Sequence, residues 1–181
     1  MLHRVKAEIG DLYPLIPDPA FKDTSATTTE PLFQREGETV PPGYLQPVAY
    51  LWTRTVTCKN PACQAEVPLV RQTWLCKKDK RYVALKLVAP KDAKRVRFEA
   101  VEATTAKGLG FDPEAGSKRG NATCPFCGTV ADSGHVKAEG CAGRMGQRLM
   151  AIVCTRSAER GKVYLSVDAL PRAVITFIKI W

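Results

Sequence analysis

Two short cysteine pairs are the residues of this sequence whose types and spacing best suit chemistry. The first pair is Cys58 and Cys63, separated by Lys-Asn-Pro-Ala, and the second is Cys124 and Cys127, separated by Pro-Phe. Two short cysteine loops that face each other supply four thiolates, a ligand set that Zn²⁺ accepts in tetrahedral structural sites. Spacers of this length are usual between zinc ligands. The spacing therefore predicts a zinc site with Cys58, Cys63, Cys124 and Cys127 as its ligands.

The residues around each pair favour tight loops. Pro125 fixes φ and Gly128 tolerates a positive φ, so the second loop can turn its backbone amides toward the sulfurs. Asn60-Pro61 gives the first loop a turn of its own. Four protein thiolates leave no coordination position for water or substrate, so we expect structural rather than hydrolytic zinc.

Other interpretations of the cysteines stay open. They could be reduced and unrelated, or the second pair could be a redox motif, although no strand and helix start of a thioredoxin-like unit surround it. Cys76, Cys141 or Cys154 could be a substitute ligand, but buried cysteine mostly acts as a small hydrophobic residue. His135, which follows the second pair, could also replace a cysteine.

Strand-like stretches lie on both sides of each cysteine pair. We expect strands at 49–56, 66–75, 81–88, 95–102, 150–154 and 162–165, with turns at 77–80, 90–94 and 157–161. The four strands at 49–56, 66–75, 81–88 and 95–102 together suggest an antiparallel meander, and Pro68 suits an edge strand. Gly140, Gly143 and Gly146 argue against a long helix in 129–146. The expected fold class is mainly β, a small α+β domain: a zinc ribbon with an inserted antiparallel β-meander and an irregular N-terminal arm.

The two ends of the chain differ from this ribbon domain, which we expect at residues 48–168. Residues 1–47 read as an extended arm or connector: a short helix at 1–12, then a Pro-rich and Thr-rich stretch that builds no core. Residues 169–181 form an apolar tail of uncertain status, either a final buried strand or sequence foreign to the fold.

Composition and charge indicate the cell compartment of the protein and the kind of partner that it binds. The sequence has no apolar run of 18 residues and no signal peptide at its start, so we expect no membrane span and a cytoplasmic protein. The number of cysteines, seven, is odd, and four of them stand in pairs of metal-ligand spacing, which favours a metal over disulfides. Residues 1–57 carry 5 basic and 7 acidic residues, whereas residues 58–181 carry 22 and 11. This basic half indicates a polyanionic partner, most simply nucleic acid, although a solvated basic surface would give the same count.

The candidate phosphate contacts lie beside the second cysteine pair or in the segment after it: Lys118, Arg119, Arg144 and Arg148. Trp52, Trp74 and Tyr82 could stack on bases, but aromatic residues in strands more often pack in a core. No catalytic motif stands out. Gly110-Phe-Asp-Pro-Glu-Ala-Gly116 is superficially similar to a turn that binds S-adenosylmethionine, but it lacks the strand before it and the helix after it that such a turn needs.

Several runs together resemble one family. They are Pro47-Val-Ala-Tyr-Leu-Trp-Thr-Arg-Thr-Val-Thr-Cys58, Cys63-Gln-Ala-Glu-Val-Pro-Leu69, Gly120-Asn-Ala-Thr-Cys-Pro-Phe-Cys-Gly128, Val136-Lys-Ala-Glu-Gly140 and Gly143-Arg-Met-Gly-Gln-Arg-Leu149. They look like the zinc ribbon of the large bacterial and archaeal adenine-specific DNA methylases that carry a DUF1156 domain, and the resemblance covers about residues 4–168.

The resemblance implies a DNA methyltransferase that uses S-adenosylmethionine, with the metal role on Cys58, Cys63, Cys124 and Cys127. In this family the cofactor turn lies before the ribbon and the catalytic motif after it, and neither matches this sequence. We therefore expect the ribbon region alone, as a fragment or a truncated reading frame that is not catalytic by itself. Its partners would be DNA and the methylase catalytic domain. The alternative is a scaffold ribbon that makes intramolecular or protein contacts without touching DNA.

Overall fold

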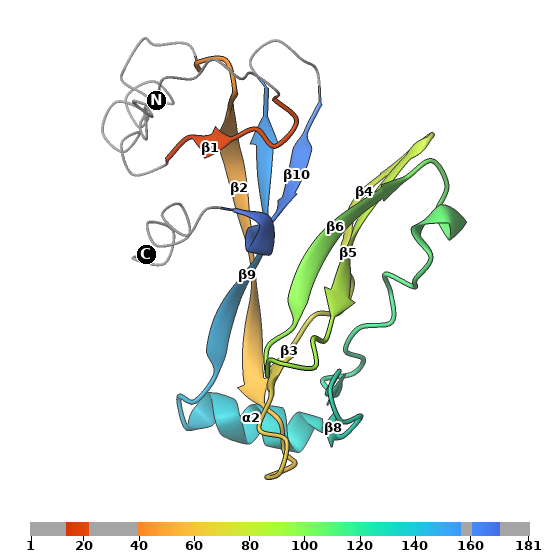
Figure 1. Ribbon diagram of the computed structural model, residues 1–181. Helices are drawn as coiled ribbons and strands as arrows, with labels where there is room; N and C mark the ends of the chain where they lie inside the picture. Colours follow the sequence, from red (N-terminus) through yellow and green to blue (C-terminus); the bar gives the residue numbers. More distant parts are fainter. Residues whose placement is uncertain (1–13, 22–39, 157–160, 171–181) are drawn as a thin grey trace. The chain divides into compact units, whose positions relative to one another are not determined.

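Antiparallel sheets dominate the computed structural model, which describes residues 14–21, 40–156 and 161–170 (Figure 1). One sheet has the strand order β1-β2-β9-β10, with β3 paired to β2; a second has the order β4-β5-β6; and a hairpin pairs β7 with β8. The predicted mainly β class is confirmed. Within the described residues, no helix has the length and apolar character needed to cross a bilayer.

The described strands are β1 (Ile16–Pro17), β2 (Tyr44–Thr57), β3 (Glu66–Pro68), β4 (Trp74–Lys78), β5 (Arg81–Val88), β6 (Arg97–Ala103), β7 (Ala122–Thr123), β8 (Val130–Ala131), β9 (Gly146–Thr155) and β10 (Val163–Ser166). The described helices are the α-helix α2 (Ser133–Cys141) and the 3₁₀-helices η2 (Lys107–Leu109) and η3 (Val167–Ala169).

The chain divides into two units. The second unit comprises Leu51–Ala151 and Ser166–Asp168, and the first comprises the described parts of Met1–Tyr50, Ile152–Leu165 and Ala169–Trp181. The long strands β2 and β9 contribute residues to both units. The expected helix at 1–12 and most of the tail at 169–181 lie outside the described residues.

The first unit has a core that the sequence did not predict. Ile16 pairs with Leu45 in the β1–β2 ladder, and neither side chain is exposed to solvent. Leu15 is also buried. The expectation that residues 1–47 build no core is therefore wrong for this part of the chain. Leu15 and Ile16 stand next to prolines, and Leu45 lies two residues before one; these prolines hide the strand periodicity, so only the long-range pairing reveals the core.

Asp18 and Arg156 form an ion pair that stabilises the first unit. The Arg156 Nε donates to Asp18 Oδ2 at 2.6 Å and Nη2 donates to Oδ1 at 3.1 Å, while the Asp18 side chain is only 9% exposed. The hydrogen bond from Arg156 lowers the pKa of Asp18 below its ordinary value. A lowered pKa means that the pair stabilises the fold above the unfolded-state pKa and that this stabilisation is lost as the pH falls.

We expect Asp18→Asn to lower the free energy of unfolding at pH 7 by about 1.5–3 kcal/mol, the usual contribution of hydrogen bonds to a charged group. The difference from the wild type should shrink below about pH 4, where the unfolded Asp18 takes up a proton. Urea unfolding of both proteins at pH 7 and pH 3 measures this difference in the free energy of unfolding. Asp92→Asn, in an exposed turn, is the matched control and should change little at either pH. A deficit of Asp18→Asn that is equal at both pH values would contradict this account.

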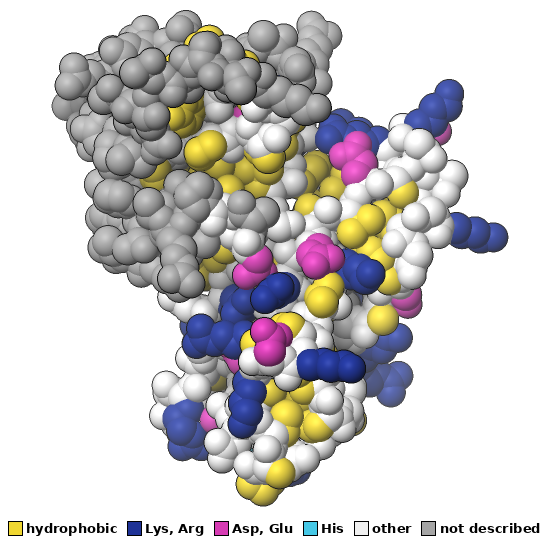
Figure 2. Space-filling model, viewed as in Figure 1, with side chains coloured by type: hydrophobic (Ala, Val, Ile, Leu, Met, Phe, Trp, Pro, Cys, Tyr) yellow, Lys and Arg dark blue, Asp and Glu magenta, His cyan; other side chains and the backbone are white. Residues whose placement is uncertain are grey.

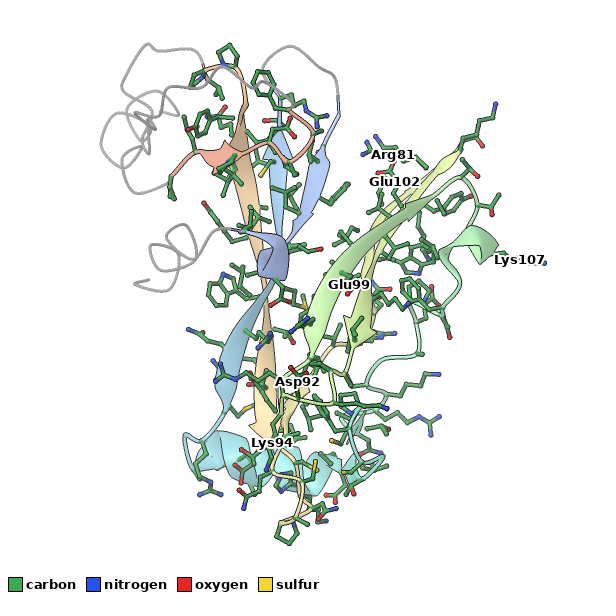
Figure 3. All side chains as sticks on the ribbon, viewed as in Figure 1. Arg81, Asp92, Lys94, Glu99, Glu102 and Lys107 are labelled. Atoms are coloured by element: carbon green, nitrogen blue, oxygen red, sulfur yellow. The ribbon has the colours of Figure 1, made fainter. Side chains whose placement is uncertain are left out.

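The second unit contains the predicted meander, reduced to three strands. β5 pairs with β4 on one side and β6 on the other, and Leu85, Val96 and Phe98 pack in the core beneath them. The strand predicted at 81–88 matches β5. The strand predicted at 49–56 belongs instead to β2 in the other sheet. The side chains of Arg81 and Glu102 face each other across β5 and β6, with Arg81 Nε 2.8 Å from Glu102 Oε1 (Figure 3).

The strand predicted at 66–75 is in fact two strands, β3 and β4. Between them the backbone bonds to a distant loop as well as to strands: the Leu69 N–H donates to the Arg54 carbonyl in β2 at 2.8 Å, and the Thr73 carbonyl accepts the Leu85 N–H of β5 at 2.9 Å. The Thr73 N–H donates to the Pro113 carbonyl at 2.8 Å, and the Val70 carbonyl accepts the Ser117 N–H at 2.7 Å. Pro68 is the last residue of β3. The break places residues 69–73 against the loop at 112–120, called here the 112–120 loop.

Helix α2 follows the second cysteine pair. Asp132 precedes it as the N-cap, and its Oδ1 accepts the His135 N–H at 2.9 Å. The helix has nine residues, which agrees with the expectation that no long helix forms there. Gly143, with φ of 68°, follows the end of the helix in a conformation that glycine adopts without strain.

Candidate metal centre

The ends of four strands bring the two cysteine pairs together in the second unit. Cys58 directly follows β2 and Cys124 directly follows β7. Cys63 lies before β3, and Cys127 lies before β8. Each pair thus occupies the loop of a β-hairpin, and the short strands β7 and β8 around the second pair were not predicted from the sequence. The Sγ atoms of all four cysteines lie within 4.8 Å of one another, close enough to hold a metal ion.

The sulfur distances suit a tetrahedral metal. The Cys58 and Cys127 Sγ atoms are 3.6 Å apart, and the Cys63 and Cys124 Sγ atoms are 3.8 Å apart. Four sulfurs at a Zn–S distance of 2.3 Å in a tetrahedron lie about 3.8 Å from each other. Both close contacts join one cysteine of the first loop to one of the second, so a single ion would tie the two hairpins together.

The two loops have the same backbone plan. The residue after the second cysteine has a positive φ in both: Gln64 at 49° and Gly128 at 74°. Each hairpin is closed by a backbone hydrogen bond, from the Cys58 N–H to the Ala65 carbonyl at 2.8 Å and from the Cys124 N–H to the Thr129 carbonyl at 2.9 Å. The role predicted for Gly128 is therefore confirmed, and in the first loop Gln64 takes the equivalent position although it is not glycine.

The four thiols differ in burial, and the pKa values of Cys58 and Cys127 shift in opposite directions for different reasons. Cys58 and Cys124 are buried, whereas Cys127 is exposed. Burial raises the pKa of the Cys58 thiol to about 12, because a charged sulfur loses its solvation there. The Thr129 hydroxyl, 3.3 Å from the Cys127 Sγ, helps to lower the pKa of Cys127 to about 6. Four thiolates this close repel one another, so a bound cation favours their ionised form.

The core around the cysteines is small. Besides Cys58 and Cys124, its fully buried members are Val56, Ala65, Val67, Ala122 and Ala131. Three alanines bury little apolar area, so this cluster supplies only a small part of the hydrophobic stabilisation that a larger core would provide. The local fold is therefore the kind that a metal stabilises directly.

Polar contacts connect the first cysteine loop to helix α2. The Lys59 Nζ lies 2.7 Å from Asp132 Oδ2, and this contact, together with the His135 N–H, lowers the pKa of Asp132 to about 2. The His135 Nε2 lies 3.1 Å from the Thr57 carbonyl, next to Cys58. Sequence reasoning missed these supports, although an aspartate at a helix start is a recognisable N-cap signal.

The other proposed ligands lie outside the cluster. Within the residues that the structure describes, the one group of metal-ligating side chains contains Cys58, Cys63, Cys124 and Cys127. Cys76 lies in β4, Cys141 at the end of α2, and Cys154 is fully buried in β9. The buried Cys154 fits the expected role of a small hydrophobic residue.

The four candidate phosphate contacts have different surroundings. Lys118 and Arg119 are exposed in the 112–120 loop. The Arg144 Nη2 lies 2.7 Å from Glu139 Oε1, so its charge is already paired. The Arg148 side chain is only 18% exposed and lies 3.6 Å from Glu66 and 3.7 Å from Asp168. Lys118 and Arg119 are therefore the pair most open to an outside anion.

The aromatic candidates are mostly engaged within the protein. Trp74 packs against Tyr82 with ring centroids 6.3 Å apart, and Lys77 covers the Trp74 ring at 4.4 Å. The Trp74 Nε1 also donates to Glu114 Oε1 at 2.9 Å. This agrees with the cross-strand packing that aromatic residues usually have in strands. Trp52 is 39% exposed.

Chemically, the arrangement offers a closed metal site. Four protein ligands complete a tetrahedral coordination shell, so such a metal would hold the fold rather than activate water. Figure 2 shows Lys and Arg side chains spread over the described surface with Asp and Glu among them. Neither a protein-family model, a curated protein nor a solved structure matches this chain.

Proposed function

We propose that this chain is a zinc-ribbon module that positions DNA for an adenine-specific DNA methylase. Its Zn²⁺ stabilises the fold, and methyl transfer from S-adenosylmethionine belongs to the catalytic domain of the methylase, the proposed protein partner. The observation that carries the metal assignment is the approach of four Sγ atoms to within 4.8 Å of one another. Zinc is favoured over other metals because a tetrahedral four-thiolate site without open positions is typical of structural zinc.

The DNA role is supported by charge and by resemblance. Residues 58–181 carry 22 basic and 11 acidic residues, and they include the metal site. The runs around both cysteine pairs resemble the ribbon of the adenine-specific methylases. A basic module of this kind binds duplex DNA through phosphates, so its affinity falls steeply as salt is added. A ribbon that serves as a scaffold would instead bind the methylase catalytic domain and show no affinity for DNA.

The first test is the zinc content of the purified chain. We expect one zinc per chain, and we expect chelation to remove much of the β-sheet signal in far-ultraviolet circular dichroism. Restoring Zn²⁺, but not Mg²⁺, should restore the signal, because Mg²⁺ prefers oxygen ligands. A folded chain that contains no zinc and resists chelation would overturn the metal assignment.

The second test is binding of a fluorescent duplex oligonucleotide over a range of salt concentrations. We expect affinity at low salt that declines linearly in a plot of log K against log salt. Absence of binding even at low salt, in a chain with its zinc in place, would reject the DNA role. Binding of the catalytic domain by that same preparation would establish the scaffold role in its place.

A further inference from the structure

A cavity of about 780 Å³ lies beside the 112–120 loop in the second unit, and none of the four cysteines lines it. Three of the residues that line it are cations: Arg71, Lys118 and Arg119. All three side chains are exposed, and no ion pair within the described residues involves any of them. Lys118 and Arg119 were candidates from the sequence, whereas Arg71 is 47 residues away from Lys118 and was not.

We propose that this cavity is the binding site for phosphate groups of the DNA backbone, with Arg71, Lys118 and Arg119 as the contacting cations. The inference rests on the proposed DNA role and assigns DNA binding to a defined site in the second unit. It also distinguishes Lys118 and Arg119 from the other two candidate residues, since Arg144 and Arg148 have carboxylate partners of their own.

Two carboxylates, Asp112 and Glu114, also line the cavity, but the charge of Glu114 is partly offset. The Glu114 Oε1 lies 2.9 Å from the Lys77 Nζ and accepts the Trp74 indole N–H at 2.9 Å. Contacts with Lys77 and Trp74, and to a lesser degree the nearby charge of Arg71, lower the pKa of Glu114. With Lys77 counted, the groups at the cavity carry four positive and two negative charges. The balance therefore favours an anion.

The lining also indicates which part of a nucleotide would enter. Gln72 and Ser117 add polar hydrogen-bonding groups, and the described lining residues include no aromatic side chain. A site that binds unstacked bases uses aromatic rings as stacking platforms. Arginine and lysine together with polar groups are the usual partners of phosphate oxygens.

The backbone of the 112–120 loop holds two of the cations in a defined place. The Lys118 N–H donates to the Asn121 carbonyl and the Asn121 N–H donates to the Lys118 carbonyl, at 3.0 and 2.9 Å. Arg119 and Gly120 between them have φ of 52° and 81°, as in a type I′ hairpin turn. The Asn121 Oδ1 then accepts the Ser133 N–H at 2.9 Å. The turn therefore presents Lys118 and Arg119 from a fixed hairpin and not from a free loop.

The same loop continues directly into the metal site. Ala122 and Thr123 form β7, and Cys124 follows. On its other side the loop is bound to residues 70–73 through the hydrogen bonds of Ser117 and Thr73. Loss of zinc should therefore disturb the cavity as well, which would make DNA binding depend on the metal although no metal ligand touches DNA.

The test compares two triple variants with equal changes of charge. Arg71→Gln, Lys118→Gln and Arg119→Gln together remove the cavity cations, whereas Lys86→Gln, Lys91→Gln and Lys107→Gln remove three exposed lysines that do not line the cavity. Figure 3 shows Lys107 pointing away from the sheet. Each variant is first confirmed to hold zinc. The zinc-loaded protein is then titrated into fluorescent duplex DNA, the probe, at several salt concentrations.

We expect the cavity variant to bind DNA at least about tenfold more weakly and to lose about 2–3 from the slope of log K against log salt, because each phosphate contact contributes about 0.9 to that slope. The control variant should keep most of its affinity and slope. If the wild type binds DNA and both variants weaken equally, the cavity assignment is overturned while the DNA role stands. If the wild type does not bind DNA, both fail.

A footprint on the unmodified chain serves as a second measurement that needs no variant. Bound duplex DNA should protect Lys118 from acylation, as read by mass spectrometry, but leave Lys107 reactive. Inorganic phosphate alone at the same phosphate concentration should protect Lys118 less, because a free ion lacks the neighbouring phosphates of a strand. Equal protection of Lys118 and Lys107 by DNA would contradict the inference.

Discussion

Replacing Cys124 by serine is expected to abolish zinc binding and to unfold the region around both cysteine loops. The Cys124 side chain is 1% exposed, and its Sγ lies 3.8 Å from the Cys63 Sγ. Structural zinc in small domains contributes an apparent binding free energy of about 10–16 kcal/mol at neutral pH. A whole domain is usually stable by only about 5–15 kcal/mol, so loss of the metal exceeds what the small alanine-rich core can offset.

The measurements are metal content by mass spectrometry and thermal unfolding by circular dichroism. Cys124→Ser should contain no stoichiometric zinc and lose most of the cooperative unfolding transition of the second unit. Cys141→Ser is the matched control, because Cys141 is an exposed cysteine outside the cluster. It should keep one zinc per chain and change the free energy of unfolding by less than about 0.5 kcal/mol. A Cys124→Ser protein with unaltered zinc content and an unaltered thermal unfolding transition would refute the four-thiolate site.

The second large effect is expected at Gly116, where the 112–120 loop crosses residues 70 and 71. A Cβ atom on Gly116 would lie 2.1 Å from the Val70 carbonyl oxygen and 2.6 Å from the Arg71 carbonyl oxygen. Both neighbours are backbone atoms, which cannot rotate away as the end of a side chain can. Gly116→Ala must therefore push the loop off this segment and break the hydrogen bond from Ser117 to Val70.

We expect Gly116→Ala to lower the free energy of unfolding by about 3 kcal/mol, at the upper end of the usual cost of overpacking. It should also weaken DNA binding, since Arg71 and the Lys118 turn would separate. Gly110→Ala is the control: Gly110 has φ of 72°, but a Cβ atom added there would meet no atom within 4 Å, so it should cost only about 1–2 kcal/mol for the left-handed conformation. Urea unfolding compares them, and an equal loss in both variants would argue against the close crossing.

The three kinds of variant change different features of the second unit. Cys124→Ser removes the metal, Gly116→Ala disturbs the loop that carries Lys118 and Arg119, and the cavity variant changes only surface charge. If all three weaken DNA binding but only Cys124→Ser loses zinc, the metal would act on DNA through the loop that precedes Cys124. If the basic surface bound DNA through diffuse charge alone, Gly116→Ala should leave DNA binding unchanged, because it changes no charge.

Local sequence was sufficient to predict the metal ligands and part of the β-sheet structure. A cysteine pair with a short spacer closes its own loop, so the identity of Cys58, Cys63, Cys124 and Cys127 as one set could be inferred without knowing the fold between them. The β-branched and apolar residues of 81–88 likewise predicted β5, because a strand in the middle of a meander packs on both sides. Each of these inferences depends on residues close together in the chain.

The tertiary structure decided what depends on residues far apart. Arg148 looked like a free cation in the sequence, but folding places it between Glu66 and Asp168; Arg71 had no visible role until the 112–120 loop joined it to Lys118 and Arg119. The break between β3 and β4 arose in the same way, since the Thr73 N–H and the Val70 carbonyl bond to the 112–120 loop. Sequence spacing sets local backbone conformation, whereas the partner of a charge or a carbonyl depends on register and packing across the whole unit, and these are settled only when the chain has folded.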